Sequence, residues 1–199
     1  MSAEAEEAAL LARAGAVAEV LREREVEALL VSEPVNLRYL TGFTGSSGLA
    51  LIPAEGEPGF FTDFRYETQS EAQLPGIFAR EIVTGDLLEA VAHGVAEGGR
   101  LGFEEASLSV KRHARLAELL GEGSELVPCG GVIEGLREVK DAGEVARIRA
   151  AAELAEEALR GVLEEGLAGR TEREVAIELE LRMRRLGAER PSFPSIVAA

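Results

Sequence analysis

The stretch Ile133–Glu165, IEGLREVKDAGEVARIRAAAELAEEALRGVLEE, decides how the chain is organised. Its apolar residues recur at spacings of three and four, at Val145, Ile148, Ala152, Ala155, Leu159 and Val162. This spacing predicts a helix with one apolar stripe opposite a charged face. Such a stripe must pack against another element, and the residues that follow look too few to bury it alone. We therefore predict that a second domain begins here and that most of it is missing from this chain.

The residues before this stretch alternate short apolar runs with helical patterns. The predicted strands are Ala28–Val31, Leu49–Pro53, Phe60–Phe64, Ile77–Val83, Leu101–Phe103 and Leu126–Cys129. The predicted helices are 4–24, 65–73, 86–98 and one that Ser109 caps, and residues 34–40 are predicted to be a short turn or helix. The strands at 49–64 form a hairpin and are antiparallel, whereas the later crossovers should be parallel. We predict an α/β domain over residues 1–131, with a mixed sheet flanked by helices.

The residues after the organising stretch predict only the beginning of the second domain, over residues 132–199. Thr171 and Glu174 form a T-x-x-E capping box, which starts a helix that runs to Leu186. Two apolar stripes on this helix imply burial between two layers. The final residues, Arg190–Ala199 (RPSFPSIVAA), predict a strand that has just begun. We expect the chain to be part of a longer protein.

Composition excludes several classes of function. Of 199 residues, 46% are hydrophobic and 29% charged, and the net charge of −15 leaves no basic stripe for phosphate contacts. Nucleic acid is therefore not an expected partner. No apolar run reaches the roughly 18 residues of a membrane span, and the acidic N-terminus is unlike a signal peptide. The single cysteine, Cys129, fits a reducing compartment, so we expect a cytoplasmic protein.

No complete catalytic or metal-ligating set is visible in these residues. His93 and His113 each lie in a predicted helix without a second ligand at suitable spacing. The acid pairs Glu104–Glu105 and Glu164–Glu165 are interpreted as solvated surface. Gly45-Ser46-Ser47-Gly48 is not a G-x-S-x-G elbow, and no histidine is placed to activate a serine. Cys129 is interpreted as a buried thiol.

Four stretches together resemble the Xaa-Pro peptidases, which include aminopeptidase P, prolidase and the related creatinase. They are Asn36–Phe43 (N-x-x-Y-L-T-G-F), Thr62–Tyr66 (T-D-x-R-Y), the linker Arg137–Ala151 with its R-x-x-K-x-x-x-E spacing, and Phe193–Val197. They occur in the order of the family and span nearly the whole chain. The resemblance implies a creatinase-type N-terminal domain, followed by the first helices of a truncated "pita-bread" α+β metallopeptidase domain.

The resemblance also implies a chemistry. A complete family member binds two divalent ions, manganese or cobalt, and activates water to hydrolyse the bond before proline in proline-containing peptides. The metal ligands of the family would lie after Ala199, so we assign no catalytic or metal residue within the chain. The segment is expected to be inactive alone and to support oligomerisation and access to the active site. The alternative is a non-catalytic module of the same fold that binds a peptide or a partner.

The resemblance places a set of substrate-gating candidates on and beside the loop that follows Y-L-T-G-F. They are Arg38, Tyr39, Phe43, Ser46, Ser47 and Arg65. In relatives this loop can reach the active site of a neighbouring subunit, so a homo-oligomer through the N-terminal domain is implied. An arginine there could hold a substrate carboxylate, and an aromatic ring could flank proline. The competing interpretation, which we favour for Tyr39, Phe43 and Arg65, is core packing and local salt bridges.

Overall fold

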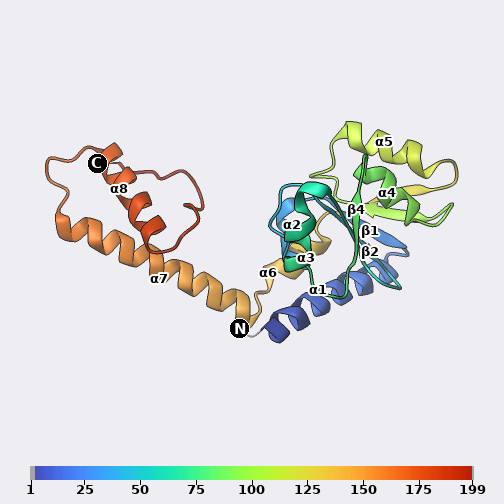
Figure 1. Cartoon of the computed structure of the whole chain (residues 1–199), viewed down its shortest axis with the longest axis horizontal. Coiled ribbons are helices and arrows are strands. Elements are labelled where there is room, and N and C mark those ends of the chain that lie inside the picture. Colours follow the sequence, from blue (N-terminus) through green and yellow to red (C-terminus); the bar gives the residue numbers. More distant parts are fainter. Residues whose placement is uncertain (1–2, 199) are drawn as a thin grey trace. The chain divides into compact units, whose positions relative to one another are not determined.

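A computed structural model describes residues 3–198 of the chain (Figure 1). Between Val139 and Lys140 they divide into two compact units. The first unit holds a sheet in the order β4-β3-β2-β1-β5-β6. Its strands are β1 (Ala28–Val31), β2 (Leu49–Pro53), β3 (Gly59–Asp63), β4 (Ala79–Val83), β5 (Arg100–Phe103) and β6 (Glu125–Pro128).

The strand directions make the sheet mixed. β2 is antiparallel to β1 and to β3, whereas the pairs β1–β5, β5–β6 and β3–β4 are parallel. The α/β class and the mixed sheet predicted from the sequence are confirmed. β4 is an edge strand, and its first three residues are exposed. This agrees with the charged Arg80 and Glu81 inside it.

Helices cover both faces of this sheet. They are α1 (Ala3–Glu23), α2 (Pro34–Thr41), the 3₁₀ turn η1 (Phe64–Tyr66), α3 (Glu67–Gln73), α4 (Leu87–His93), α5 (Val110–Leu120) and α6 (Val132–Glu138). Asp86 and Ser109 cap α4 and α5 as predicted, although α4 ends at His93 rather than Gly98. Among residues 3–198, no helix is long and apolar enough to cross a membrane.

Two hydrophobic cores lie on opposite faces of the sheet. On one face, Leu29 and Val31 of β1 pack with residues of α1, α2 and α6. On the other face, Ala28 and Leu30 pack with residues of α4 and α5. Successive strand residues point to opposite faces, so all four residues of β1 are buried. Figure 1 shows α4 and α5 together on one side of this unit.

The stretch Ile133–Glu165 contributes to both units. Val132 and Ile133 of α6 are buried in the first core. Asp141 then begins a new helix, since its carboxylate accepts from the backbone N–H of Glu144 at 2.7 Å in a capping box. The sequence-based domain boundary after Gly131 remains a prediction about the complete fold.

The second unit consists of α7 (Ala142–Glu165), α8 (Glu172–Arg185) and irregular residues. The predicted capping box of Thr171 and Glu174 is present. α8 contacts α7 closely, and Arg182 pairs with Glu165 and, at 2.7 Å, with Glu178. The apolar stripe of α7 is only partly covered, because Ala158 and Val162 are its buried residues.

The strand predicted at Arg190–Ala199 is wrong for the residues that the structure describes. Residues 190–198 form no strand, and Phe193 and Ile196 are 68% and 87% exposed. A strand needs a neighbour to accept its backbone hydrogen bonds, and the described part of this unit offers only helices. Ala199 lies outside the described residues.

Candidate functional site

The loop of residues 42–48 lies at the carboxyl edge of the sheet. β1, β3 and β5 run in the same direction, so their carboxyl ends meet there. The loop joins α2 to the start of β2, which runs the opposite way and therefore begins at that edge. In open α/β sheets this edge is where ligands usually bind. Five of the six gating candidates lie on α2 or on this loop after it.

Local hydrogen bonds set how the chain leaves α2. Gly42 adopts a left-handed conformation with φ of +76°, and its N–H donates to the carbonyl of Arg38 at 2.8 Å. The hydroxyl of Thr41 donates to the Leu37 carbonyl at 2.7 Å and accepts from the N–H of Phe43 at 3.1 Å. The T-G-F sequence therefore builds the turn that carries the loop.

Phe43 anchors the loop in the first core. Its side chain is 1% exposed, and its ring meets those of Phe60 and Tyr66 edge to face at 4.9 and 5.5 Å. A Cβ on Gly45 would overlap the Phe43 ring and lie 2.7 Å from Cδ1 of Tyr66. The loop can approach these rings only because residue 45 is glycine.

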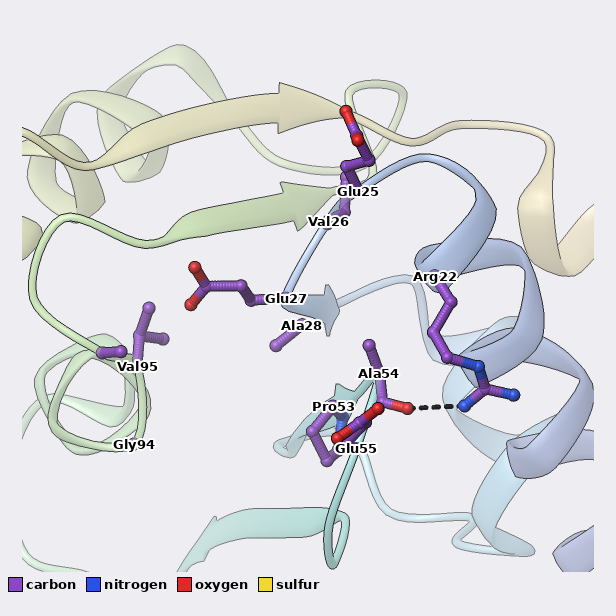
Figure 2. Close-up of a pocket in the computed structure, with 11 residues that line it drawn as sticks. Arg22, Glu25, Val26, Glu27, Ala28, Pro53, Ala54, Glu55, Gly94 and Val95 are labelled. Carbon is purple, nitrogen blue, oxygen red and sulfur yellow. Dashed lines mark hydrogen bonds between the residues drawn. The ribbon is translucent and has the colours of Figure 1, made fainter.

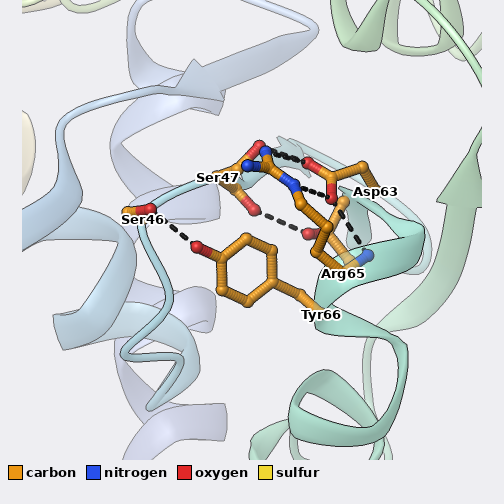
Figure 3. Close-up of polar contacts among 6 residues, drawn as sticks. Ser46, Ser47, Asp63, Arg65 and Tyr66 are labelled. Carbon is orange, nitrogen blue, oxygen red and sulfur yellow. Dashed lines mark hydrogen bonds and ion pairs between the residues drawn. The ribbon is translucent and has the colours of Figure 1, made fainter.

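Ser46 ties the loop to η1, and Ser47 ties it to the end of β3 (Figure 3). The hydroxyls of Ser46 and Tyr66 share a hydrogen bond of 2.6 Å. Ser47 donates to Oδ2 of Asp63 at 2.7 Å, and its carbonyl accepts from the Thr62 hydroxyl at 2.6 Å. The pKa of Tyr66 is lowered, chiefly by its hydrogen bond with Ser46. Both serines therefore hold the loop in place.

Arg65 is held by Asp63. Its Nε and Nη2 each lie 2.8 Å from one carboxylate oxygen, which is a two-pronged ion pair. The hydrogen bond from Arg65, followed by that from Ser47, keeps the pKa of Asp63 far below its usual range. The same pairing raises the pKa of Arg65. Both of these guanidinium N–H groups of Arg65 already bond to Asp63. Arg65 is therefore poorly placed to bind a substrate carboxylate.

Arg38 and Tyr39 lie on α2, before the loop. Tyr39 is half-buried under Arg13, whose guanidinium carbon lies 4.1 Å from the ring centre. Nη1 of Arg13 also donates to the Tyr39 carbonyl at 2.8 Å. Arg38 is exposed, so among these candidates it is the cation most open to a ligand. The gating roles of the six residues remain predictions.

The interpretation of Glu104 as solvated surface is wrong. Glu104, which follows β5, is 5% exposed. Its Oε2 accepts from the backbone N–H groups of Ser32 and Glu33 at 2.6 and 2.8 Å, and its Oε1 accepts from Asn36 at 2.7 Å. These donors compensate for burial, which nevertheless raises the pKa of Glu104 above its ordinary value. Its partner in the sequence pair, Glu105, is exposed, as are Glu164 and Glu165.

Asn36 extends this network to α6. Its Nδ2 also donates to Oε1 of Glu134 at 2.6 Å, and its Oδ1 accepts from Arg137 at 2.9 Å. The hydrogen bond from Asn36 is the main reason that the pKa of Glu134 is lowered. Asn36 and Arg137 belong to two of the four motifs, so the network explains why both stretches carry polar residues. Sequence reasoning missed Glu104 because its partners are distant along the chain.

The remaining candidates for chemistry are isolated. His93 is exposed, and His113 is half-buried with its ring 4.9 Å from that of Phe103. Cys129 is a buried free thiol, as predicted, and burial raises its pKa. Within residues 3–198, no group of three or more His, Cys, Asp or Glu side chains could hold a metal ion. The described residues therefore do not fit a metal centre.

A hollow of about 530 Å³ lies at the other end of the sheet, beside the start of β1 and the end of β2 (Figure 2). Glu25, Glu27 and Glu55 line it, and Arg22 donates to the carbonyl of Ala54 at 2.7 Å. The described residues that line it include no histidine, cysteine or serine. It offers no nucleophile and no imidazole base for catalysis.

Two protein-family models match the chain in succession. Residues 13–139 match the Creatinase/Prolidase N-terminal domain, and residues 146–199 match Metallopeptidase family M24. The first match covers the unit that carries the loop and the Asn36 network. The second begins inside α7, within the organising stretch.

Known proteins agree with this assignment. The chain is 38% identical to the uncharacterized peptidase YqhT of Bacillus subtilis over 87% of this chain and 49% of that protein. A structure of the Xaa-Pro dipeptidase from Bacillus anthracis superposes with a TM-score of 0.85 at 30% identity, covering 92% of this chain and 51% of that one. The N-terminal domain of cytoplasmic peptidase PepQ from Mycobacterium tuberculosis matches at 34% identity and a TM-score of 0.59, over 63% of this chain and 98% of that domain. The chain spans about half the length of the curated relatives it matches.

Proposed function

The chain belongs to the creatinase/prolidase family of Xaa-Pro peptidases, and from this we propose that it forms the N-terminal part of an enzyme that hydrolyses the peptide bond before proline. The observation that carries the proposal is the succession of the two family matches along one chain. The similarity to an Xaa-Pro dipeptidase over 92% of the chain supports the same reaction. Proline-containing peptides are the proposed substrates.

The metal centre of the proposed enzyme would be formed by residues other than those described. The family implies divalent ions, of which manganese and cobalt are our candidates, and such ions supply an activated water when bound. Residues 3–198 contain no cluster that fits them. We therefore assign to this chain the support of the active site and none of its chemical steps.

The proposed role of the first unit is to narrow access to the active site of a neighbouring subunit. The loop of residues 42–48 suits this role because it is rigidly held by Phe43, Ser46 and Ser47. A rigid loop can limit the length of peptide that enters the active site. Because the loop is already ordered, it loses little conformational entropy when a peptide binds. Arg38 is the exposed residue that could meet a substrate carboxylate. A homo-oligomer through this unit is part of the proposal.

A chimera tests this function. The segment of Bacillus subtilis YqhT that the chain matches is replaced by this chain, and hydrolysis of Ala-Pro is compared with that of Ala-Ala in the presence of manganese. The expected result is cleavage that requires proline and is lost when EDTA is added. Intact YqhT is the reference for both peptides. Equal cleavage of Ala-Ala by the folded chimera would contradict the proposal and favour a general peptidase.

The same chimera tests the loop. Arg38→Gln is expected to raise KM for Ala-Pro several-fold with a smaller effect on kcat, because a lost ground-state contact weakens binding. Arg149→Gln removes an exposed positive charge from α7 and serves as the control. If Arg38 does not contact the substrate, both variants will keep the parental KM for Ala-Pro. Light scattering will show separately whether the chimera is a monomer. A monomer with full activity would refute the role in a neighbouring subunit.

A further inference from the structure

A second hollow lies beside the loop of residues 42–48, which we call the site loop. It has a volume of about 460 Å³, within the range of roughly 300–1,000 Å³ found for small-molecule sites. Its walls are Ser32 after β1, residues 34 and 37 of α2, the loop residues 45–48, Leu87 at the start of α4, and Arg112 in the first turn of α5. All of these segments belong to the first unit and lie at the carboxyl edge of the sheet.

The lining of this hollow is positively charged, although the chain as a whole is acidic. Among the described residues, Arg112 is the only charged one in its lining, whereas the whole chain carries a net charge of −15. By contrast, the hollow in Figure 2 is lined by three glutamates and one arginine, and another beside α1 is lined by Glu6 and Glu7. An anion entering the Arg112 hollow meets no carboxylate in its wall.

Arg112 is available for a ligand. Its side chain is half-buried, and within residues 3–198 its guanidinium makes no hydrogen bond or ion pair. Its neighbour on the helix, Arg115, pairs with Asp86 at 3.3 Å. Arg65 is also occupied, by Asp63. A half-buried, unpaired guanidinium gains more from an incoming anion than a fully hydrated one does.

The loop residues that line the hollow have backbone N–H groups without a partner in the described part of the chain. The backbone N–H groups of residues 45–48 donate to no acceptor among the described residues. Ser46 and Ser47 hold this backbone in place through Tyr66 and Asp63, so its N–H groups need no reorganisation when a ligand arrives. Successive backbone N–H groups are a recurring feature of anion sites.

We propose that this hollow binds a small carboxylate, which Arg112 holds by a two-pronged contact and the backbone of residues 45–48 completes. A carboxylate fits because its two oxygens match the two parallel N–H groups of a guanidinium. Its source is either a free organic acid or the C-terminal carboxylate of a short peptide. The proposal does not rest on the peptidase function, because binding is a property of the first unit alone.

The test is ¹⁵N NMR titration of the 199-residue chain with sodium acetate, and with acetyl-Ala-Ala beside its C-terminal amide, at constant ionic strength. We expect saturable shifts of the amide signals of Gly45 to Gly48 and of Nε of Arg112. The dissociation constant should be about 1–10 mM, as suits one charge-assisted contact. Acetyl-Ala-Ala should bind and its amide should not. If acetate binds and acetyl-Ala-Ala does not, a free organic acid is the source of the carboxylate.

Arg112→Gln should weaken acetate binding at least about tenfold, which corresponds to one lost charge-assisted contact. Lys111→Gln removes the same charge from the next, exposed position and should leave binding unchanged. Arg112→Lys keeps the charge but loses the pair of parallel N–H groups, so its affinity for acetate should lie between those of Arg112→Gln and Lys111→Gln. The proposal is overturned by the absence of saturable shifts, by equal binding of the peptide amide, by binding of inorganic phosphate but not acetate, or by equal effects at positions 111 and 112.

Discussion

Asn36 and Glu104, 68 residues apart in the chain, are joined by a hydrogen bond of 2.7 Å between Nδ2 and Oε1. Asn36 lies on α2, which carries the site loop, and Glu104 follows β5 at the carboxyl edge of the sheet. Asn36 also bonds to Glu134 and Arg137 of α6. One buried amide therefore fixes α2 to the sheet on one side and to α6 on the other.

Asn36→Ala should lower the free energy of unfolding by about 3 kcal/mol, because it removes a donor from a buried carboxylate and leaves a cavity. Urea denaturation of the 199-residue chain measures this effect. Val35→Ala on the same helix is the matched control, since Val35 is 51% exposed, and its change should stay within about 0.5 kcal/mol. Equal effects of the two substitutions would show that the network does not stabilise the fold.

Glu104→Gln should destabilise the chain more at acidic than at neutral pH. Burial raises the pKa of Glu104, so the folded state binds its proton more tightly than the unfolded state does. The contribution of Glu104 is therefore greatest below its ordinary pKa of 4.5 and declines as the pH rises through the higher folded value. Glutamine does not titrate. Urea denaturation between about pH 4 and 8 should show a deficit that shrinks with rising pH; a growing deficit would reverse the assigned sign.

Gly45→Ala should displace the site loop, because the added methyl group overlaps Phe43 and crowds Tyr66. We expect destabilisation of about 1–3 kcal/mol. Gly15→Ala is the contrasting control. Gly15 lies inside α1 with nothing within 4 Å of an added Cβ, so the change should stabilise by about 0.5–1 kcal/mol. Thermal melting of both variants measures the difference, and a neutral Gly45→Ala would mean that the loop is not seated on these rings.

Arg65→Gln should raise the pKa of Asp63 toward its ordinary value of 3.8, because the two-pronged ion pair is lost. Asp63 favours the folded state above its ordinary pKa, and this contribution is lost as the pH falls toward the depressed folded value. ¹³C NMR titration of the side-chain carboxyl follows the change. Arg80→Gln is the control, because Arg80 lies on the neighbouring strand β4 level with Phe60 and away from Asp63. An Asp63 pKa that is the same in all three proteins would contradict the pairing.

Local patterns in the sequence predict the elements of the first unit well. Ala28–Val31 and Leu49–Pro53 are strands with the predicted bounds, because short apolar runs between turn residues have few other ways to bury themselves. Asp86, Ser109 and Thr171 cap helices as predicted, since a capping hydrogen bond reaches only two or three residues along the chain.

Contacts between residues that are far apart in the chain could not be predicted from the sequence. Glu104 stands next to Glu105 and has the pattern of solvated surface, and only its contacts with Ser32, Glu33 and Asn36 bury it. Arg112 is one basic residue among several in its helix, and nothing local distinguishes it from Lys111. The apolar residues near Ile196 resemble a strand, yet a strand exists only where another strand pairs with it.

The decisive measurement is hydrolysis of Ala-Pro, with added manganese, by the 199-residue chain and by its chimera with the rest of YqhT. We expect proline-dependent, EDTA-sensitive cleavage by the chimera and none by the 199-residue chain, whose described residues hold no metal-binding group. Cleavage by the 199-residue chain alone would contradict the claim that it supports the active site without supplying the chemistry. A folded chimera that leaves Ala-Pro intact while intact YqhT cleaves it would contradict the assignment of this chain to an Xaa-Pro peptidase.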